Sequence, residues 1–471
     1  MRHMNSRIAR MGTTCLLTGS LVFSLAACGR TPKTAEESSE SAVQTVLTDE
    51  SASDAATSDA TASTTKDATT SLAAMSSTGV ISTADLFTER DLAQVADTSA
   101  AKKITVQSGQ DVQVTQEGVY ILTGEAQDVT ITVEAPDDAK VQLVLDGLTI
   151  TNEDAPAIYV KSADKVFVTT VEGTTSTLAV TETFVADGDT NTDAVVFSKD
   201  DLVLNGLGTL VVNSTDNGVT SKDDLKVTGG TYQITATDNG LEAHDSILVA
   251  DGSLSITSSA KDGLHAEDDE DDTTGLIYIC GGTFSINAAD DGIHATTYLQ
   301  VDSGTLDISA GEALEATYVQ VNGGDLKVAA TDDGVNATYK SQSVGTPTIE
   351  VTGGTLAVTM GQGDTDALDA NGNIVVSGGQ IDISAQFAFD FDGTASFTGG
   401  TITVNGEQVS EITNSMMGGM GGGPMGGGQM GEMPEGGMGP GGGMGHGGGP
   451  RGGSDTNGQT TELVTGETYS G

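Results

Sequence analysis

Tryptophan is absent from this chain of 471 residues, cysteine occurs only three times, and 19 lysines and arginines face 67 aspartates and glutamates. No arginine occurs between Arg90 and Arg451. Because nucleic-acid binding needs clustered lysine and arginine, the composition argues against a nucleic-acid partner. The missing arginines also weaken any mechanism in which a guanidinium group clamps a carboxylate or a phosphate.

The scarcity of cysteine excludes an intrachain disulfide in the body of the protein. Cys15 and Cys28 fall in the first 28 residues, which leaves Cys280 alone. Cys280 ends an apolar run that begins at Leu276, and this position predicts a buried structural thiol, not a nucleophile. The 63 glycines and the lack of tryptophan indicate turn-rich β structure.

Residues 1–28 have the features of a lipoprotein signal peptide. Three arginines precede the mostly apolar run 11–27, which is too short for a comfortable membrane span. Residues 25–28 read Leu-Ala-Ala-Cys, the lipobox pattern of bacterial lipoproteins. We therefore expect lipidation of Cys28 and a membrane-anchored protein on the extracellular face of a bacterial cell. A secretory signal with a chance cysteine, or a short membrane anchor, is the alternative. Loss of the three arginines would change the net charge from −48 to −51.

Composition divides the remaining chain into four parts. Residues 29–80 are rich in Ser, Thr, Ala and Asp, which predicts a disordered stalk. Residues 81–103 could form a short helix that caps the following domain. Residues 104–415 contain short alternating apolar runs typical of strands. Residues 416–471 form a Gly/Met-rich low-complexity tail, for which a flexible tail is favoured over a Cu(I) site.

An internal repeat dominates residues 104–415. Gly-Gly-Thr-like turns recur, mostly at spacings of 20 to 25 residues, and an Asp-Gly-like marker lies between them. A period of about 22 residues with three short strands predicts a single-stranded right-handed parallel β-helix of roughly ten coils, an all-β fold. The ladder of a leucine-rich repeat is missing, and a propeller blade is about twice as long. The turns begin at Gly229, Asp251, Gly281, Ser303, Gly323, Gly353, Gly378 and Gly399.

Stacked coils convert equivalent sequence positions into a column of side chains. Two residues after the marker glycine, the column contains Thr220, Glu242, His265, His294, Glu315, Asn336, Asp369 and Asp390. Neighbours in an ideal stack lie ~4.8 Å apart. Carboxylates at this spacing repel unless they are protonated, hydrogen-bonded or bridged by a cation. The column therefore predicts a hard cation, chiefly Ca²⁺, as its cofactor.

Two sets of residues are candidate metal ligands. The first set contains Glu242, His265, Glu267, Asp268, Asp269, Asp291 and His294. A solvated acidic loop on a polar face, or Zn²⁺ held by the histidines and Glu242, is the alternative for this set. The second set contains Asp187, Asp189 and Asp193. It resembles the opening of a Ca²⁺ loop, but the glycine at the sixth place and the closing glutamate are absent.

Several segments have a familiar pattern, among them Ala194–Leu202, Ser221–Gly230 and Asp262–Ile293. With them the chain resembles the bacterial carbohydrate-binding-domain family of extracellular parallel β-helices, over about residues 104–415. The resemblance implies a pectate-lyase-like fold, association with Ca²⁺, and binding of cellulose and acidic plant-wall sugars without established lyase activity. Glu312-Ala313, in place of Asp-Gly, departs from the pattern.

These observations favour a monomeric cell-surface lipoprotein that binds polysaccharide with Ca²⁺ and without catalysis. The absence of tryptophan gives little support to a broad aromatic platform for crystalline cellulose. One alternative is a polyuronate lyase with Lys222 or Lys261 as its base. The other is a passive surface rod or protein adhesin. The sequence assigns no catalytic residue and no sugar-contacting residue.

Overall fold

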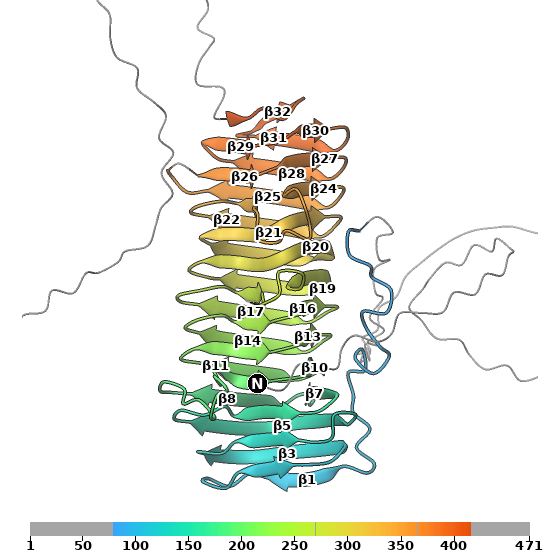
Figure 1. Ribbon diagram of the computed structural model, residues 1–471, viewed down its shortest axis with the longest axis vertical. Coiled ribbons are helices and arrows are strands. Elements are labelled where there is room, and N and C mark those ends of the chain that lie inside the picture. Colours follow the sequence, from blue (N-terminus) through green and yellow to red (C-terminus); the bar gives the residue numbers. More distant parts are fainter. Residues whose placement is uncertain (1–78, 269, 364, 416–471) are drawn as a thin grey trace, which may run out of the picture. The chain divides into compact units, whose positions relative to one another are not determined.

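The alternating apolar runs form short β-strands that stack in three files, as the computed structural model shows for residues 79–415 except 269 and 364 (Figure 1). Along each file, a strand pairs in parallel with the equivalent strand of the next repeat. The all-β class and the parallel arrangement are therefore confirmed. The predicted signal peptide with Cys28, nearly all of the stalk and almost the whole tail lie outside the described residues.

The first file contains β1 (Lys102–Thr105), β3 (Gly118–Gln127), β5 (Lys140–Asn152), β7 (Lys165–Thr170), β10 (Asp201–Gly206), β13 (Asp224–Val227), β16 (Ser246–Val249), β24 (Thr348–Val351), β27 (Asn373–Val376) and β30 (Ala395–Phe397). The second file contains β8 (Thr175–Val180), β11 (Thr209–Asn213), β14 (Thr231–Ala236), β17 (Ser253–Ser258), β22 (Asp325–Ala330), β25 (Thr355–Met360), β28 (Gln380–Ser384), β31 (Thr401–Val404) and the antiparallel β32 (Glu407–Val409).

The third file contains β2 (Val112–Val114), β4 (Ile131–Glu134), β6 (Ile158–Ser162), β9 (Ala194–Ser198), β12 (Asn217–Ser221), β15 (Leu241–Ala243), β18 (Leu264–Ala266), β23 (Val335–Ala337), β26 (Asp366–Ala370) and β29 (Phe387–Phe391). Long strands bend at the corners and belong to more than one file: β3, β5, β19 (Leu276–Asn287), β20 (Asp291–Ala310) and β21 (Glu312–Val321).

The hydrophobic core lies inside the stack, because successive side chains of each strand point alternately inward and outward. In β17, Leu254 and Ile256 point inward and are buried, whereas Ser253, Ser255 and Thr257 face solvent. Ile256 lies in register between Ile234 and Ile286, so each coil buries its apolar residues against the coils on either side. Burial of each such side chain contributes about 1.5–3 kcal/mol. The buried cluster extends from Val106 to Ile402.

Residues 79–101, here called the strap, differ from the helix predicted over residues 81–103. The strap contains turns and bends without a helix, and β1 already begins at Lys102. It runs along the flank of the stack in place of capping an end, as the blue segment in Figure 1 shows. The Ile81 N–H donates to Gln300 Oε1 at 2.8 Å, and Gln94 Nε2 donates to the Thr228 carbonyl at 2.8 Å.

Two further findings concern the described part of the chain. Cys280 is buried and forms no disulfide there, as its apolar run predicts. No helix in this part is long and apolar enough to cross a membrane.

Candidate functional site

The predicted polar column is one continuous ladder on the third file. Each residue lies in register with the next on the neighbouring strand, which confirms the alignment made from the marker glycine. The ladder contains Thr220, Glu242, His265, His294, Glu315, Asn336, Asp369 and Asp390.

Glu242 is neutralised by protein groups. Lys222 Nζ lies 2.9 Å from its Oε1, while Asn217 Nδ2 and Asn239 Nδ2 donate to its Oε2 at 2.8 and 2.9 Å. Burial raises the pKa of the Glu242 carboxyl, but Lys222 and the hydrogen bonds lower it more, so the net pKa is below its ordinary value. Glu242 lies next to His265 in the ladder, but both of its carboxylate oxygens already bind Lys222 or the two asparagines.

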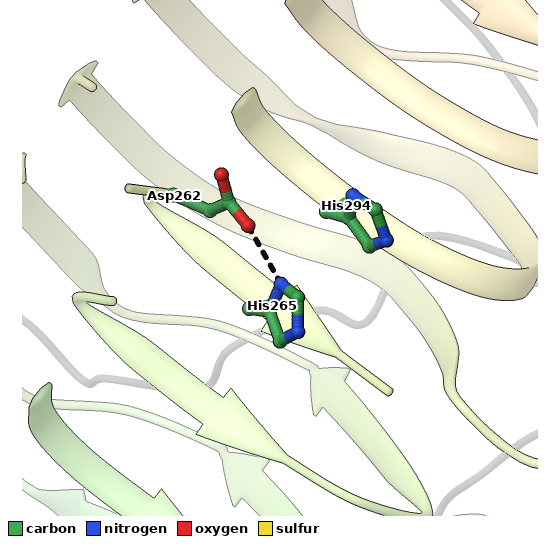
Figure 2. Close-up of side chains that lie close together, drawn as sticks. All are labelled: Asp262, His265 and His294. Carbon is green, nitrogen blue, oxygen red and sulfur yellow. Dashed lines mark hydrogen bonds and ion pairs between the residues drawn. The ribbon is translucent and has the colours of Figure 1, made fainter. Parts of the chain in front are cut away.

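His265 and His294 form a stacked pair with ring centroids 4.7 Å apart and ring planes at 25° (Figure 2). Each Nδ1 contacts the carboxylate three residues earlier in the chain. His265 Nδ1 lies 2.6 Å from Asp262 Oδ2, and His294 Nδ1 lies 2.7 Å from Asp291 Oδ2. Asp262, His265 and His294 bring their ligand atoms within 4.8 Å of one another.

A second such group contains Asp291, His294 and Glu315. Glu315 Oε2 lies 2.8 Å from His294 Nδ1 and 2.9 Å from Lys340 Nζ. Burial lowers the pKa of His294, but its carboxylate neighbours raise it more, to about 11. Burial raises the pKa of Asp291, and His294 and Lys340 hold the pKa of Glu315 low despite its burial. Without a metal ion, His294 is thus an imidazolium held among carboxylates.

The acidic insertion after His265 contributes one residue to this pair. Glu267 Oε2 lies 3.5 Å from His265 Nε2 and 3.3 Å from His294 Nε2. Asp268 instead lies 3.9 Å from His244, and Asp269 lies outside the described residues. The predicted first set is therefore only partly brought together, around the two histidines.

The second predicted set remains separate. Asp187 Oδ2 forms an ion pair with Lys161 Nζ at 2.6 Å, and this bond lowers the pKa of Asp187. Asp193 is largely buried and accepts a hydrogen bond from Asn191, whereas Asp189 is exposed. Within the described ranges, these three aspartates do not form a group of metal-ligating atoms.

Ca²⁺, which the family resemblance implies, fits the histidine groups poorly because it prefers six to eight oxygen ligands. Oxygen donors without imidazole lie further along the ladder, where Asp369 and Asp390 are in register. Burial, and after it the neighbouring carboxylates led by Asp333, raise the pKa of Asp369 to about 7. These donors suit a hard cation by type, although within the described residues they do not bring three ligand atoms within 4.8 Å of one another.

A polar cavity of about 490 Å³ lies at the corner between the third and first files. Its size is in the range of small-molecule sites. Burial raises the pKa of two of its carboxyls, those of Asp200 and Asp201. Sequence reasoning missed this site, although the repeated Ser-Lys-Asp-Asp at 198–201 and 221–224 was a signal for it. The charged lining groups are Asp137, Lys161, Asp164, Lys199, Asp200, Asp201 and Asp223.

Comparison with known proteins identifies the family. The family described as "Carbohydrate-binding domain-containing protein" matches residues 108–365 and 312–409, more than half of the chain. The chain belongs to this family. A protein of Acetivibrio thermocellus with the same description is 38% identical over 207 residues, 43% of this chain and 72% of the relative. A solved structure, called the polysaccharide lyase-like protein from C. thermocellum (gadolinium derivative), is 31% identical with a TM-score of 0.42, covering 44% of this chain and 91% of its own.

In this member of the carbohydrate-binding family, the two lysines considered as a lyase base have carboxylate partners. Lys222 is paired with Glu242, and Lys261 Nζ lies 3.5 Å from Asp238 Oδ2. Burial lowers the pKa of Lys261, but Asp238 raises it more, so the net pKa lies above its ordinary value. A raised pKa makes Lys261 a poor general base.

Proposed function

We propose that this protein binds polysaccharide without catalysis, through the corner cavity and the polar ladder beside it. The polar cavity is the observation that carries the proposal, and membership of a carbohydrate-binding family supports it. Its five aspartates can accept hydrogen bonds from sugar hydroxyls, while Lys161 and Lys199 can donate to sugar oxygens. The excess of carboxylates favours neutral, hydroxyl-rich glycans in the cavity itself.

Acidic glycans need a cation between their carboxylates and those of the protein. The net charge of −48 repels a polyuronate at long range. We propose that Ca²⁺ provides the bridge at the oxygen-only part of the ladder, around Asp369 and Asp390. A cation there would also relieve the repulsion that contributes to the raised pKa of Asp369.

The proposed setting is the outer surface of a bacterial cell. Lipidation of Cys28 would anchor the protein, and residues 29–80 would hold the domain away from the membrane. We infer that the stacked strands form a right-handed β-helix of roughly ten coils, a form that displays one long polar face as a monomer. The parallel pairing of successive repeats supports this inference.

Calorimetry of the full chain with cello-oligosaccharides and with polygalacturonate, each in Ca²⁺ and in chelator, tests this function. We expect binding of the neutral glycan in both conditions and binding of polygalacturonate only in Ca²⁺. Absorbance of the same mixtures monitors unsaturated uronide products. Formation of unsaturated products would show that the protein is a lyase. If no glycan gives a heat of binding, the passive surface rod is the remaining function.

A matched pair of variants localises the binding. Asp164 lines the cavity, and its carboxylate lies 2.8 Å from Lys140 Nζ. Asp307 does not line the cavity and forms a similar ion pair, with 3.0 Å between its carboxylate and Lys327 Nζ. Asp164→Asn should weaken glycan binding at least about fivefold through a lost hydroxyl acceptor. Asp307→Asn should leave it unchanged. If both variants bind glycan as tightly as the wild type, the cavity is not the glycan-binding site.

A further inference from the structure

The stacked histidines share a local design on two successive coils. Both follow the same four-residue pattern, Asp262-Gly-Leu-His265 and Asp291-Gly-Ile-His294, and the two patterns lie in register. In both, the aspartate contacts the Nδ1 atom of its histidine, as Figure 2 shows for Asp262 and His265. A carboxylate that holds Nδ1–H as a donor leaves Nε2 to face a ligand, and a metal ion that binds there displaces the Nε2 proton of the imidazolium. Histidines that ligate metals are typically held in this way.

The Nε2 atoms of the pair face one carboxylate oxygen. Glu267 Oε2 lies 3.5 Å from His265 Nε2 and 3.3 Å from His294 Nε2. Bonds of about 2.0–2.2 Å to a tetrahedral Zn²⁺ place neighbouring ligand atoms about 3.3–3.5 Å apart. Two edges of such a site are therefore already present.

An unsatisfied atom marks the same place. His294 is buried, and its Nε2 has an ion-pair contact with Glu267 Oε2 at 3.3 Å that lacks the geometry of a hydrogen bond. A buried polar atom without a hydrogen bond is costly, and a bound ion would satisfy it. The two Nε2 atoms and the Glu267 oxygen do not lie within 4.8 Å of one another among the described residues, so metal binding requires the His265 ring, the more exposed of the two at 21% against 7%, to turn toward His294.

We propose that His265 Nε2, His294 Nε2 and Glu267 Oε2 bind a borderline divalent transition metal ion of the Zn²⁺ type. Two imidazoles and one carboxylate suit Zn²⁺, whereas Ca²⁺ requires oxygen ligands. Asp262 and Asp291 orient the two rings, and the surrounding carboxylates attract the cation. The site is distinct from the oxygen-only part of the ladder and from the corner cavity, and it does not rest on glycan binding.

Metal titration without sugar tests this proposal. Chelator-treated full chain is titrated calorimetrically with Zn²⁺ and separately with Ca²⁺, and Co²⁺ absorption in the visible range reports a four-coordinate site with nitrogen ligands. We expect one Zn²⁺ per chain that excess Ca²⁺ does not displace. His265→Gln should weaken this binding about 100-fold or more, and Glu267→Gln about tenfold or more.

The variants separate loss of a ligand from loss of the fold. His265 and Glu267 are both partly exposed, so their replacement spares the buried His294. His244→Gln is the matched control, because His244 lies one coil away beside Asp268. Circular dichroism confirms folding. The proposal fails if the folded wild type binds no Zn²⁺, if Zn²⁺ binding survives in His265→Gln, or if Ca²⁺ competes equally.

Discussion

Single residues in the ladder show two ways of compensating buried negative charge and one carboxylate whose charge is not compensated. Glu242 is held by a lysine and two amides, and Glu315 is held by His294 and Lys340. Asp369, in contrast, has only carboxylates among the groups that shift its pKa. The first two arrangements stabilise the charged form, and the third penalises it. The ladder therefore has a pH-sensitive end.

Asp369→Asn should stabilise the metal-free protein at pH 8. The pKa of Asp369 is about 7 when folded, against an ordinary 3.8, because of burial and then the carboxylates of Asp333, Asp390, Asp366 and Asp392. Between these values the folded chain binds more protons, so the stability contributed by protonated Asp369 is full below about pH 4 and is lost as the pH rises through 7. With a discount for solvent screening, we expect a gain of about 1 kcal/mol at pH 8 and none near pH 4.

Thermal unfolding in chelator across this pH range measures the effect. Asp307→Asn, at an exposed ion pair, is the control. Addition of Ca²⁺ at pH 8 should raise the melting temperature of the wild type more than that of Asp369→Asn, because the ion binds only the folded carboxylates. Identical pH profiles of variant and wild type would show that Asp369 is not destabilised by ionisation.

The sequence predicted the ladder because side-chain position in a stacked strand depends only on the repeat. It could not predict which carboxylates were already engaged. Lys340 lies in the insertion that follows the next strand of the ladder, β23, and no repeated residue pattern links it to Glu315. The Asp-x-x-His spacing that orients both rings was visible in the sequence, and its meaning required the pairing of the two coils.

At the scale of elements, the glycine turns set how closely the coils approach. Gly354 has φ 74° and follows β24, and a Cβ at this position would lie 2.6 Å from the backbone carbon of Gly323 on the neighbouring coil. Gly173 has nearly the same φ, 72°, with no atom within 4 Å of its Cβ position. A comparison of substitutions at the two positions therefore distinguishes the cost of backbone strain from the cost of a clash between coils.

Gly354→Ala should destabilise the protein much more than Gly173→Ala. Both pay about 1–2 kcal/mol for a left-handed alanine. Gly354→Ala also forces backbone apart in a packed stack, which adds about 1–3 kcal/mol. Urea unfolding of both variants measures the difference, and equal losses would mean that φ alone selects glycine in these turns.

The helix predicted over residues 81–103 is absent for a local reason. The Thr88 N–H donates to Asp91 Oδ2 at 2.8 Å, and the Asp91 N–H donates to Thr88 Oγ1 at 3.2 Å. This reciprocal pair resembles the start of a helix. The chain makes only one turn there, in which the Leu92 N–H donates to the Thr88 carbonyl at 3.2 Å, and then continues along the flank. On this flank Ile81 is buried in a cluster with Leu248 and Tyr278. Tertiary burial therefore outweighs the local signal.

At the scale of the whole domain, the strap supplies contacts that the repeat cannot. In a stack of coils each unit contacts only its neighbours, so stability is roughly a sum of adjacent interactions. The strap crosses several coils. Asp91, in the middle of the strap, contacts Lys165 at 3.5 Å, and near the start of the strap the Val80 N–H donates to Gln320 Oε1 at 3.0 Å. No repeat pattern in the sequence could have revealed a segment from outside the repeat lying across it.

Deletion of residues 79–101 should therefore lower cooperativity as well as stability. Without the strap, coils between residues 165 and 320 lose their common partner, so local opening no longer requires separation from distant coils. We expect a smaller urea m-value, because part of the surface is exposed before the main transition. Hydrogen exchange should accelerate first in β16 and β19, which lose their cover over Leu248 and Tyr278. Gln94→Ala, which removes the bonds to Thr228, Gly206 and the Leu92 carbonyl but keeps the rest of the strap, is the control and should keep the m-value. A single transition with unchanged m in the deletion variant would mean that contacts between adjacent coils alone make the stack unfold as one unit.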